Sequence, residues 1–182
     1  MKIGLSQRVL FHKERAYDSI EHGWYSYLKD HMLNFIPNRT DQDFKTLADD
    51  LDLLILTGGD DSLIRRTTEI KIATQMLIQS KPIIGVCHGA FLLTSLLGGS
   101  VIQKDGHADS VHSVLYNRQL YNVNSFHNLA IEKVHTTAKI LAVDTDGDCE
   151  SWIDKNIAAI VWHPERMDNP WIPKEILHLI KN

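Results

Sequence analysis

The sequence predicts an α/β fold: a single-domain, open and mostly parallel sheet with helices on both faces and a small antiparallel hairpin region. Three continuous apolar segments predict strands that are buried on both sides, as the central strands of a parallel sheet are. They are Leu51–Leu56, Ile83–Val86 and Ile157–Trp162. A helical segment separates the first two strands, and another helical segment follows the second. This alternation of strands and helices is typical of βαβ units.

Composition narrows the class of protein. The 182 residues, 43% of them hydrophobic, suffice for one full core, so we expect one domain over residues 1–182. The net charge is -4 and no run of Lys or Arg stands out, so we expect neither a nucleic acid nor a membrane surface as partner. Cys87 and Cys149 predict free thiols, because the N-terminus resembles a strand and not a secretory signal. We therefore expect a cytoplasmic protein that acts on a small molecule or on another protein.

The first strand is predicted over Lys2–Ser6, and the polar residues that follow place Arg8 at its carboxyl end. Ligands of open α/β sheets collect at that end of the strands, which makes Arg8 a candidate substrate contact. An ordinary solvated arginine is the alternative. The next segments predict a loop at His12–Asp18, a helix at Ile20–Leu33, a short strand at Phe35–Pro37 and a short helix at Asp43–Asp49.

The strand Leu51–Leu56 ends in the motif Thr57-Gly58-Gly59-Asp60. Paired glycines let backbone amides approach a ligand closely, so Gly59 is a candidate donor to an oxyanion and Gly58 a candidate substrate contact. A plain turn is the alternative, since Gly-Gly is common in turns. A helix is predicted over Thr67–Gln79, with its inward face formed by Ile70, Ala73, Thr74, Leu77 and Ile78.

The strand Ile83–Val86 leads into Cys87 and then into an apolar helix that begins near Ala90. This is the layout of a nucleophile elbow, in which a tight strand-to-helix turn presents one reactive side chain. Gly85 and Gly89 flank Cys87, where the backbone must bend and nothing bulky can crowd the nucleophile. The amides at the start of the helix would stabilise a thiolate and receive an oxyanion. A buried core cysteine is the alternative, but the flanking glycines favour catalysis.

In the second half of the chain, Gly98-Gly99 predicts the end of this helix. Further strands are predicted at Tyr121–Ile131, Ile140–Val143 and Glu150–Ile153, with a hairpin turn at Asp146-Gly147 and a final helix at Ile172–Ile180. His107 and His112 lie near Asp105 and Asp109, but their spacing matches no standard zinc pattern. We therefore expect no metal site.

A second polar motif follows the strand Ile157–Trp162. His163 comes directly after this strand, at the same edge of the predicted sheet as Cys87, and Glu165 is two residues further on. In cysteine-based acyl transfer a thiolate attacks, an imidazole moves protons and a carboxylate fixes the tautomer of the imidazole. His-Pro-Glu alone is a weak signal, but together with the elbow it predicts a triad in the chain order Cys, His, Glu.

Three motifs resemble, in order and spacing, the class I glutamine amidotransferase-like fold over nearly the whole chain. They are Thr57-Gly58-Gly59-Asp60, Gly85-Val86-Cys87-His88-Gly89 and His163-Pro164-Glu165. The resemblance implies that Cys87 is the nucleophile, His163 the general base and acid, and Glu165 its orienter. It also implies an oxyanion hole formed by the amides of Gly59 and His88, and a γ-glutamyl thioester as intermediate.

The segment Asn124–Lys133, NSFHNLAIEK, resembles the γ-glutamyl hydrolase branch of this family and, most closely, the γ-glutamyl-CDP-amidate hydrolases of bacterial capsule phosphoramidate synthesis. In that branch this strand holds the α-amino and α-carboxylate ends of the glutamyl group. The resemblance therefore implies substrate contacts for Ser125, Phe126 and His127, with core packing as the alternative for Phe126. Many relatives carry glutamine four residues after the nucleophile, where this chain has Phe91, so the binding of the α-carboxylate is expected to differ.

Three hypotheses about function follow. The first is a hydrolase that cleaves the γ-glutamyl amide bond of a small conjugate, best γ-glutamyl-CDP-amidate, and yields glutamate and cytidine diphosphoramidate for surface polysaccharide modification. The second is a glutaminase subunit that delivers ammonia to a separate synthetase, and the third is a non-catalytic binding relative. The chemistry needs no cofactor. A diphosphate could be met by Arg8, Arg65 or Arg66, whereas the sequence leaves open the leaving group and whether the chain forms a homodimer or pairs with a synthetase.

Overall fold

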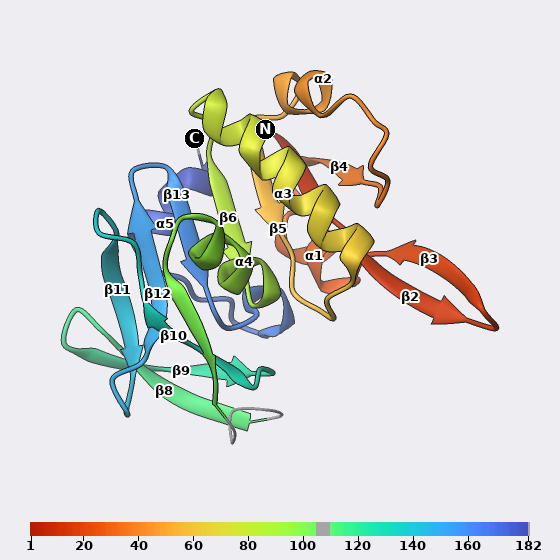
Figure 1. Ribbon diagram of the computed structural model, residues 1–182. Helices are drawn as coiled ribbons and strands as arrows, with labels where there is room; N and C mark the ends of the chain where they lie inside the picture. The colour runs from red at the N-terminus through yellow and green to blue at the C-terminus, as the bar shows by residue number, and fades with distance from the viewer. Residues whose placement is uncertain (105–109, 182) are drawn as a thin grey trace.

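The computed structural model describes residues 1–104 and 110–181 (Figure 1). Its elements in chain order are β1 (Lys2–Ser6), β2 (Arg8–His12), β3 (Arg15–Ser19), α1 (Gly23–Tyr27), β4 (Met32–Ile36), α2 (Phe44–Asp49), β5 (Leu53–Leu56), α3 (Leu63–Ile78), β6 (Ile83–Val86), α4 (His88–Leu96), β7 (Ser100–Gln103), β8 (Ser110–Tyr116), β9 (Gln119–Ser125), β10 (Leu129–Lys133), β11 (Lys139–Asp144), β12 (Cys149–Asp154), β13 (Ile157–Ile160), the 3-10 helix η1 (Pro164–Arg166) and α5 (Lys174–Lys181).

The parallel part of the main sheet has the strand order β4-β1-β5-β6-β13. All four residues of β5 and of β6 are buried, as their continuous apolar sequences predict. Leu56 pairs with Gly85, and Val86 pairs with Ile160, so the carboxyl ends of β5, β6 and β13 are level. The residues that follow these three strands are therefore delivered to one edge of the sheet.

Beyond β13 the same sheet continues with antiparallel strands, in the order β12-β11-β8-β9, and β10 joins β12 to β7. In Figure 1, α3 and α4 lie in front of the parallel strands and α5 lies behind them. The predicted fold class is thus confirmed, and its antiparallel part contains the expected β11–β12 hairpin together with the β8–β9 hairpin. Among the helices of the described residues, none has the length and apolar character that crossing a membrane requires.

Two predictions for the N-terminal region are wrong. The segment His12–Asp18 is not a loop, because it contains the end of β2, a turn and most of β3. These two strands form a separate antiparallel sheet, which projects from the molecule in Figure 1. The segment Ile20–Leu33 is not one helix, because α1 covers only Gly23–Tyr27 and β4 already begins at Met32. Parallel pairing of β4 with β1 outweighs the helical spacing of the apolar residues in this segment.

The inward face of α3 also differs from the prediction. The helix begins at Leu63, directly after the N-cap Ser62, and buries six residues. These are Arg65, Thr68, Glu69, Ile72, Ala73 and Met76. Of the predicted inward residues only Ala73 is fully buried, whereas Ile78 is 70% exposed. The spacing of apolar residues gave the wrong inward face because two charged residues, Arg65 and Glu69, face the interior, where they pair with each other.

Candidate functional site

Cys87 lies at the turn between β6 and α4. Its backbone has φ 50° and ψ -107°, a conformation that a non-glycine residue adopts only where the surrounding structure imposes it. A Cβ on Gly85 would lie 2.4 Å from the carbonyl oxygen of Gly89, and a Cβ on Gly89 would lie 2.1 Å from that of Leu56. Both glycines are therefore needed for the tight turn. The turn leaves Cys87 as the N-cap residue of α4, a nine-residue helix, with its side chain largely buried.

His163 and Glu165 lie beyond the end of β13 and form a close pair. The imidazole Nδ1 is 2.6 Å from Oε1 of Glu165, which is part of η1, and both side chains are almost completely buried. A Cβ on Gly58 would lie 2.2 Å from Cε1 of His163, so only glycine fits at this position. The structure thus places Gly58 directly against the imidazole.

The charge of His163 depends on two neighbours. Burial lowers the pKa of the imidazole, but hydrogen bonding to the side chains of Cys87 and Glu165, and their negative charges, outweigh burial and raise the pKa to about 9. His163 is therefore a cation at neutral pH, beside the side chains of Cys87 and Glu165. By contrast, burial and the nearby Glu150 charge raise the pKa of the other thiol, Cys149, to about 12. Cys149 is thus an inert core residue.

Asn124, at the end of β9, holds the backbone of His163. Its side-chain amide donates to the His163 carbonyl oxygen and accepts from the His163 amide, each at 2.8 Å. This two-point contact fixes the start of the segment that carries the imidazole. Asn124 lies in the NSFH segment, but no pattern in the sequence indicates this role.

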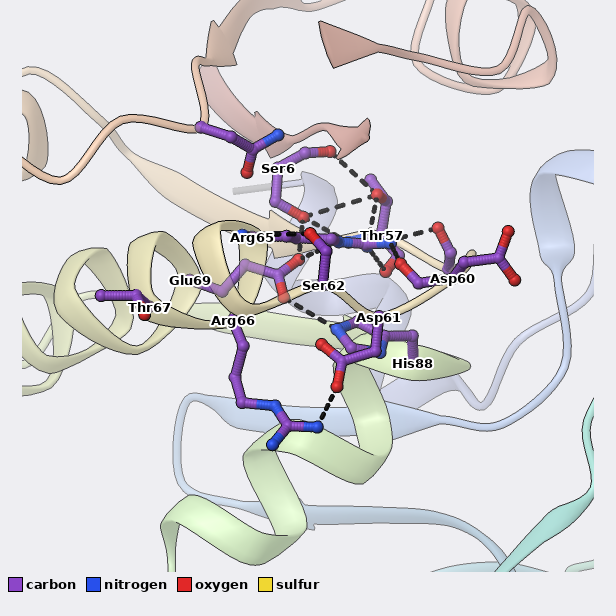
Figure 2. A network of polar contacts seen from close by, with 12 residues as sticks. Ser6, Thr57, Asp60, Asp61, Ser62, Arg65, Arg66, Thr67, Glu69 and His88 are labelled. Atoms are coloured by element: carbon purple, nitrogen blue, oxygen red, sulfur yellow. Dashed lines mark hydrogen bonds and ion pairs between the residues drawn. The ribbon is translucent and has the colours of Figure 1, made fainter. Parts of the chain in front are cut away.

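The loop after β5 is held by a buried arginine (Figure 2). The Arg65 side chain donates to the carbonyl oxygens of Thr57 (2.6 Å) and Asp60 (2.9 Å), and Thr57 is also hydrogen-bonded to Ser6. Gly59, in the middle of this loop, has φ +118°, which favours glycine. Arg65 of α3 therefore fixes the loop that carries the candidate oxyanion donor. Because Arg65 is completely buried, the suggestion that it meets a diphosphate is wrong.

Glu69 connects this loop to the turn at Cys87. Its Oε1 accepts from Arg65 (3.0 Å) and Ser6 (2.6 Å), and its Oε2 lies 2.9 Å from Nε2 of His88, whose ring points toward it in Figure 2. Burial alone would raise the pKa of Glu69. The hydrogen bond with His88 and the positive charge of Arg65 together lower this pKa by more, so the net shift is downward. We call the set Ser6, Thr57, Arg65, Glu69 and His88 the buried network.

The residues predicted to contact the substrate lie in different surroundings. Phe126 is 42% exposed and packs edge-on against the His163 ring, with 5.6 Å between the ring centroids. Ser125 is completely buried. Nδ1 of His127 is 2.7 Å from the carbonyl oxygen of Leu129, and its ring packs 5.8 Å from that of Phe91. Phe126 is therefore the predicted residue of this segment that the structure places at the surface beside His163.

A cavity of about 440 Å³ lies beside α4, between α3 and the strands β7 and β10. His88 and Phe91 line it, whereas Cys87 does not. Phe91, at the position where many relatives have glutamine, thus forms part of an apolar wall next to the elbow. Arg66, at the rim, forms an ion pair with Asp61.

Arg8 lies above the glycine loop, where its Nε would be 3.2 Å from a Cβ on Gly59. Its Nη2 donates to Oε2 of Glu21 (2.7 Å). Arg166, three residues after His163, donates to both carboxylate oxygens of Glu21 (2.8 Å each). We call Arg8, Glu21 and Arg166 the arginine cluster. Sequence analysis missed Glu21 and Arg166.

No group of three or more potential metal-ligating side chains occurs in the described residues. His112 lies 3.4 Å from the Glu150 carboxylate, so it forms an ion pair when protonated. Asp105, His107 and Asp109, which the sequence places near it, lie outside the described residues.

An elbow cysteine, a histidine–glutamate pair and a glycine loop at one edge of a parallel sheet are the features expected of a glutamine amidotransferase. The chain belongs to the class I glutamine amidotransferase family, whose model matches residues 15–177. It is 29% identical to the γ-glutamyl-CDP-amidate hydrolase of Campylobacter jejuni over the full length of both chains, and 27% identical to protein NtpR of Enterococcus hirae over 64% of this chain and 68% of that one.

Solved structures have the same fold at lower identity. A candidate GMP synthase subunit from Thermoplasma acidophilum superimposes with a TM-score of 0.76 at 18% identity, covering 99% of this chain and 92% of its own. A glutamine amidotransferase of Thermotoga maritima gives a TM-score of 0.70 at 13% identity, with 90% of this chain and 76% of its own covered.

Proposed function

We propose that the protein is a cysteine-dependent hydrolase that cleaves the γ-glutamyl amide bond of a small conjugate and releases L-glutamate. The observation that carries the proposal is the strained turn at Cys87 beside the hydrogen-bonded His163–Glu165 pair. Cys87 is the nucleophile, His163 the acid and base, and Glu165 the group that orients the imidazole.

In the first half of the reaction the Cys87 thiolate attacks the γ-carbonyl carbon. The amides of Gly59 and His88 receive the oxygen as it becomes negative. Cationic His163 then gives its proton to the amide nitrogen, the C–N bond breaks, and a γ-glutamyl thioester remains on Cys87. In the second half His163 removes a proton from water, whose oxygen attacks the thioester carbon. The C–S bond then breaks, and the new carboxyl group loses its proton to solvent as glutamate leaves. The proton held by His163 and the released thiolate restore the starting thiolate–imidazolium pair.

The specific substrate that we propose is γ-glutamyl-CDP-amidate. Full-length similarity to the Campylobacter jejuni hydrolase supports this substrate, as does the NSFHNLAIEK segment, from which Phe126 and Asn124 contact His163. The product would be cytidine diphosphoramidate, consistent with a role in surface polysaccharide modification.

The test is glutamate release by the purified chain from glutamine, γ-glutamyl-γ-aminobutyrate and γ-glutamyl-CDP-amidate. We expect turnover of a conjugate to exceed that of glutamine. Cys87→Ala and His163→Ala should lose about a millionfold in kcat, and Glu165→Ala about ten-thousandfold, because an orienting group matters less than a reacting one. Full activity in Cys87→Ala would exclude this mechanism. Glutamine turnover that appears only after a synthetase is added would indicate a glutaminase subunit instead.

A further inference from the structure

We propose that the arginine cluster is the leaving-group site and selects amides whose leaving amine carries an anionic oxygen group, a phosphate or a carboxylate. The inference rests on the proposed hydrolase function. Its starting point is the position of the general acid: His163 protonates the leaving nitrogen, so the leaving group must lie next to the imidazole. The surroundings of His163 therefore indicate what the leaving group meets.

His163 is only 1% exposed, so a leaving group must approach the imidazole past the residues that cover it. Its Nδ1 atom is hydrogen-bonded to Glu165, and Gly58 packs against its Cε1 atom. The partly exposed Phe126 packs edge-on against the ring. The Arg166 guanidinium lies over the Phe126 ring, 4.6 Å from its centroid. Arg166 is thus next to Phe126, the partly exposed residue that packs against the general acid.

Arg8 lies over Gly59 on the loop of the candidate oxyanion hole. Oε2 of Glu21 accepts from both Arg8 and Arg166, at 2.7 and 2.8 Å. One carboxylate therefore holds two guanidinium groups next to the reaction centre.

The charges of the cluster do not balance. Burial alone would raise the pKa of Glu21, but the adjacent Arg166 and Arg8 together lower this pKa by more. Glu21 is therefore ionised, and the cluster of two arginines and one glutamate has a net charge of +1. Within residues 1–104 and 110–181, Glu21 is the carboxylate that forms ion pairs with Arg8 and Arg166, and both arginine side chains keep about a quarter of their surface exposed, 24% and 22%. Guanidinium groups bind phosphate and carboxylate oxygens through paired hydrogen bonds. The cluster can therefore bind one anionic group from solution.

Other arginines near the site lack this capacity. Arg65 is buried and paired with Glu69, and Arg66 is paired with Asp61. Arg66 therefore provides a matched control, since its substitution also removes one positive charge from the same region.

The experiment compares kcat/KM for γ-glutamyl methylamide, γ-glutamyl-γ-aminobutyrate and γ-glutamyl-CDP-amidate, whose leaving amines are neutral, carboxylate-bearing and phosphate-bearing. We expect the wild type to prefer an anionic leaving group. Arg8→Gln should reduce the ratio of anionic to neutral kcat/KM by about 10- to 100-fold, the cost of losing a charged hydrogen-bond donor. Arg166→Lys, which keeps the charge but loses the two-point geometry, should reduce it less, and Arg66→Gln should leave the ratio unchanged.

Each outcome is decisive. The anionic amide with the larger kcat/KM relative to the neutral amide identifies whether the cluster binds a carboxylate or a phosphate. Equal losses on neutral and anionic amides in Arg8→Gln, with the melting temperature retained, would mean that the cluster holds the glutamyl end and would overturn the inference. Equal wild-type activity on all three amides would overturn it while the hydrolase function stands. Failure to hydrolyse any of them would overturn the proposed function and, with it, the inference.

Discussion

The glycine loop Thr57-Gly58-Gly59-Asp60 lies between two groups of charged residues that differ in composition and exposure. In the buried network, Arg65 and Glu69 are completely inaccessible, and every nitrogen of the guanidinium group donates to a named acceptor. In the arginine cluster two partly exposed arginines share one carboxylate. Balanced and saturated charges stabilise a fixed geometry, whereas an excess of exposed charge binds a ligand. The contrast separates a group that fixes the geometry of the loop from one that we propose recognises the substrate.

The largest expected effect comes from breaking the buried network. Glu69→Ala leaves the Arg65 guanidinium buried without its carboxylate, and we expect a loss of about 3–5 kcal/mol in the free energy of unfolding, measured by denaturant titration. Glu69→Gln keeps the hydrogen-bonding shape and should lose less. Activity should fall by a similar factor on neutral and anionic amides, unlike the selective loss expected for Arg8→Gln.

A double variant separates stability from positioning. Arg65→Met combined with Glu69→Leu leaves no unpaired buried charge, so part of the lost stability should return. The carbonyl oxygens of Thr57 and Asp60 lose their donors, so kcat should remain low. Wild-type kcat in a stable double variant would contradict a positioning role for the network.

A smaller effect is expected at the loop itself, which both groups contact. In Gly58→Ala the new methyl group would lie 2.2 Å from Cε1 of His163, so the imidazole or the loop must move. A displacement of about 1 Å at the reaction centre costs about 100-fold in rate, so kcat should fall by that order while the fold is retained. Circular dichroism and steady-state kinetics measure the two quantities. A variant with unchanged kcat would show that the imidazole tolerates displacement.

The sequence predicted the parts of the site whose signals are local. The apolar strands β5, β6 and β13 and the residues at their carboxyl ends were found because a continuous apolar run and its flanking glycines are adjacent in the chain. Glu21, Arg166 and the role of Asn124 were missed because their partners are distant in sequence. Glu21 and Arg166 are separated by 145 positions, and Asn124 lies 39 positions from His163. Such pairs have no local pattern.

The prediction of which residues of α3 face inward was wrong for a different reason. Arg65 and Glu69 are spaced four residues apart, as an exposed ion pair on a helix surface would be, and burial cannot be distinguished from exposure by spacing alone. Only the carbonyl oxygens of the loop after β5, together with Ser6 and His88, make an interior position for these charges favourable.

The smallest expected effect concerns the titration of His163, whose pKa is set by burial, Cys87 and Glu165 and by neither of the two groups. Folding raises the pKa of the imidazole from 6.5 to about 9, so its contribution to stability is complete below about pH 6.5 and is lost as the pH rises through about 9. The same deprotonation removes the acid that the leaving group needs, so kcat/KM should fall with an apparent pKa near 9. Because Cys87 is the first of the two neighbours that raise this pKa, Cys87→Ala should lower it, measured by NMR titration of the imidazole. In Arg66→Gln, whose arginine is paired with Asp61, the pKa should not change. An unshifted pKa in Cys87→Ala would mean that the thiol and the imidazole do not form a charge pair, and the mechanism would then require His163 to act first as a base.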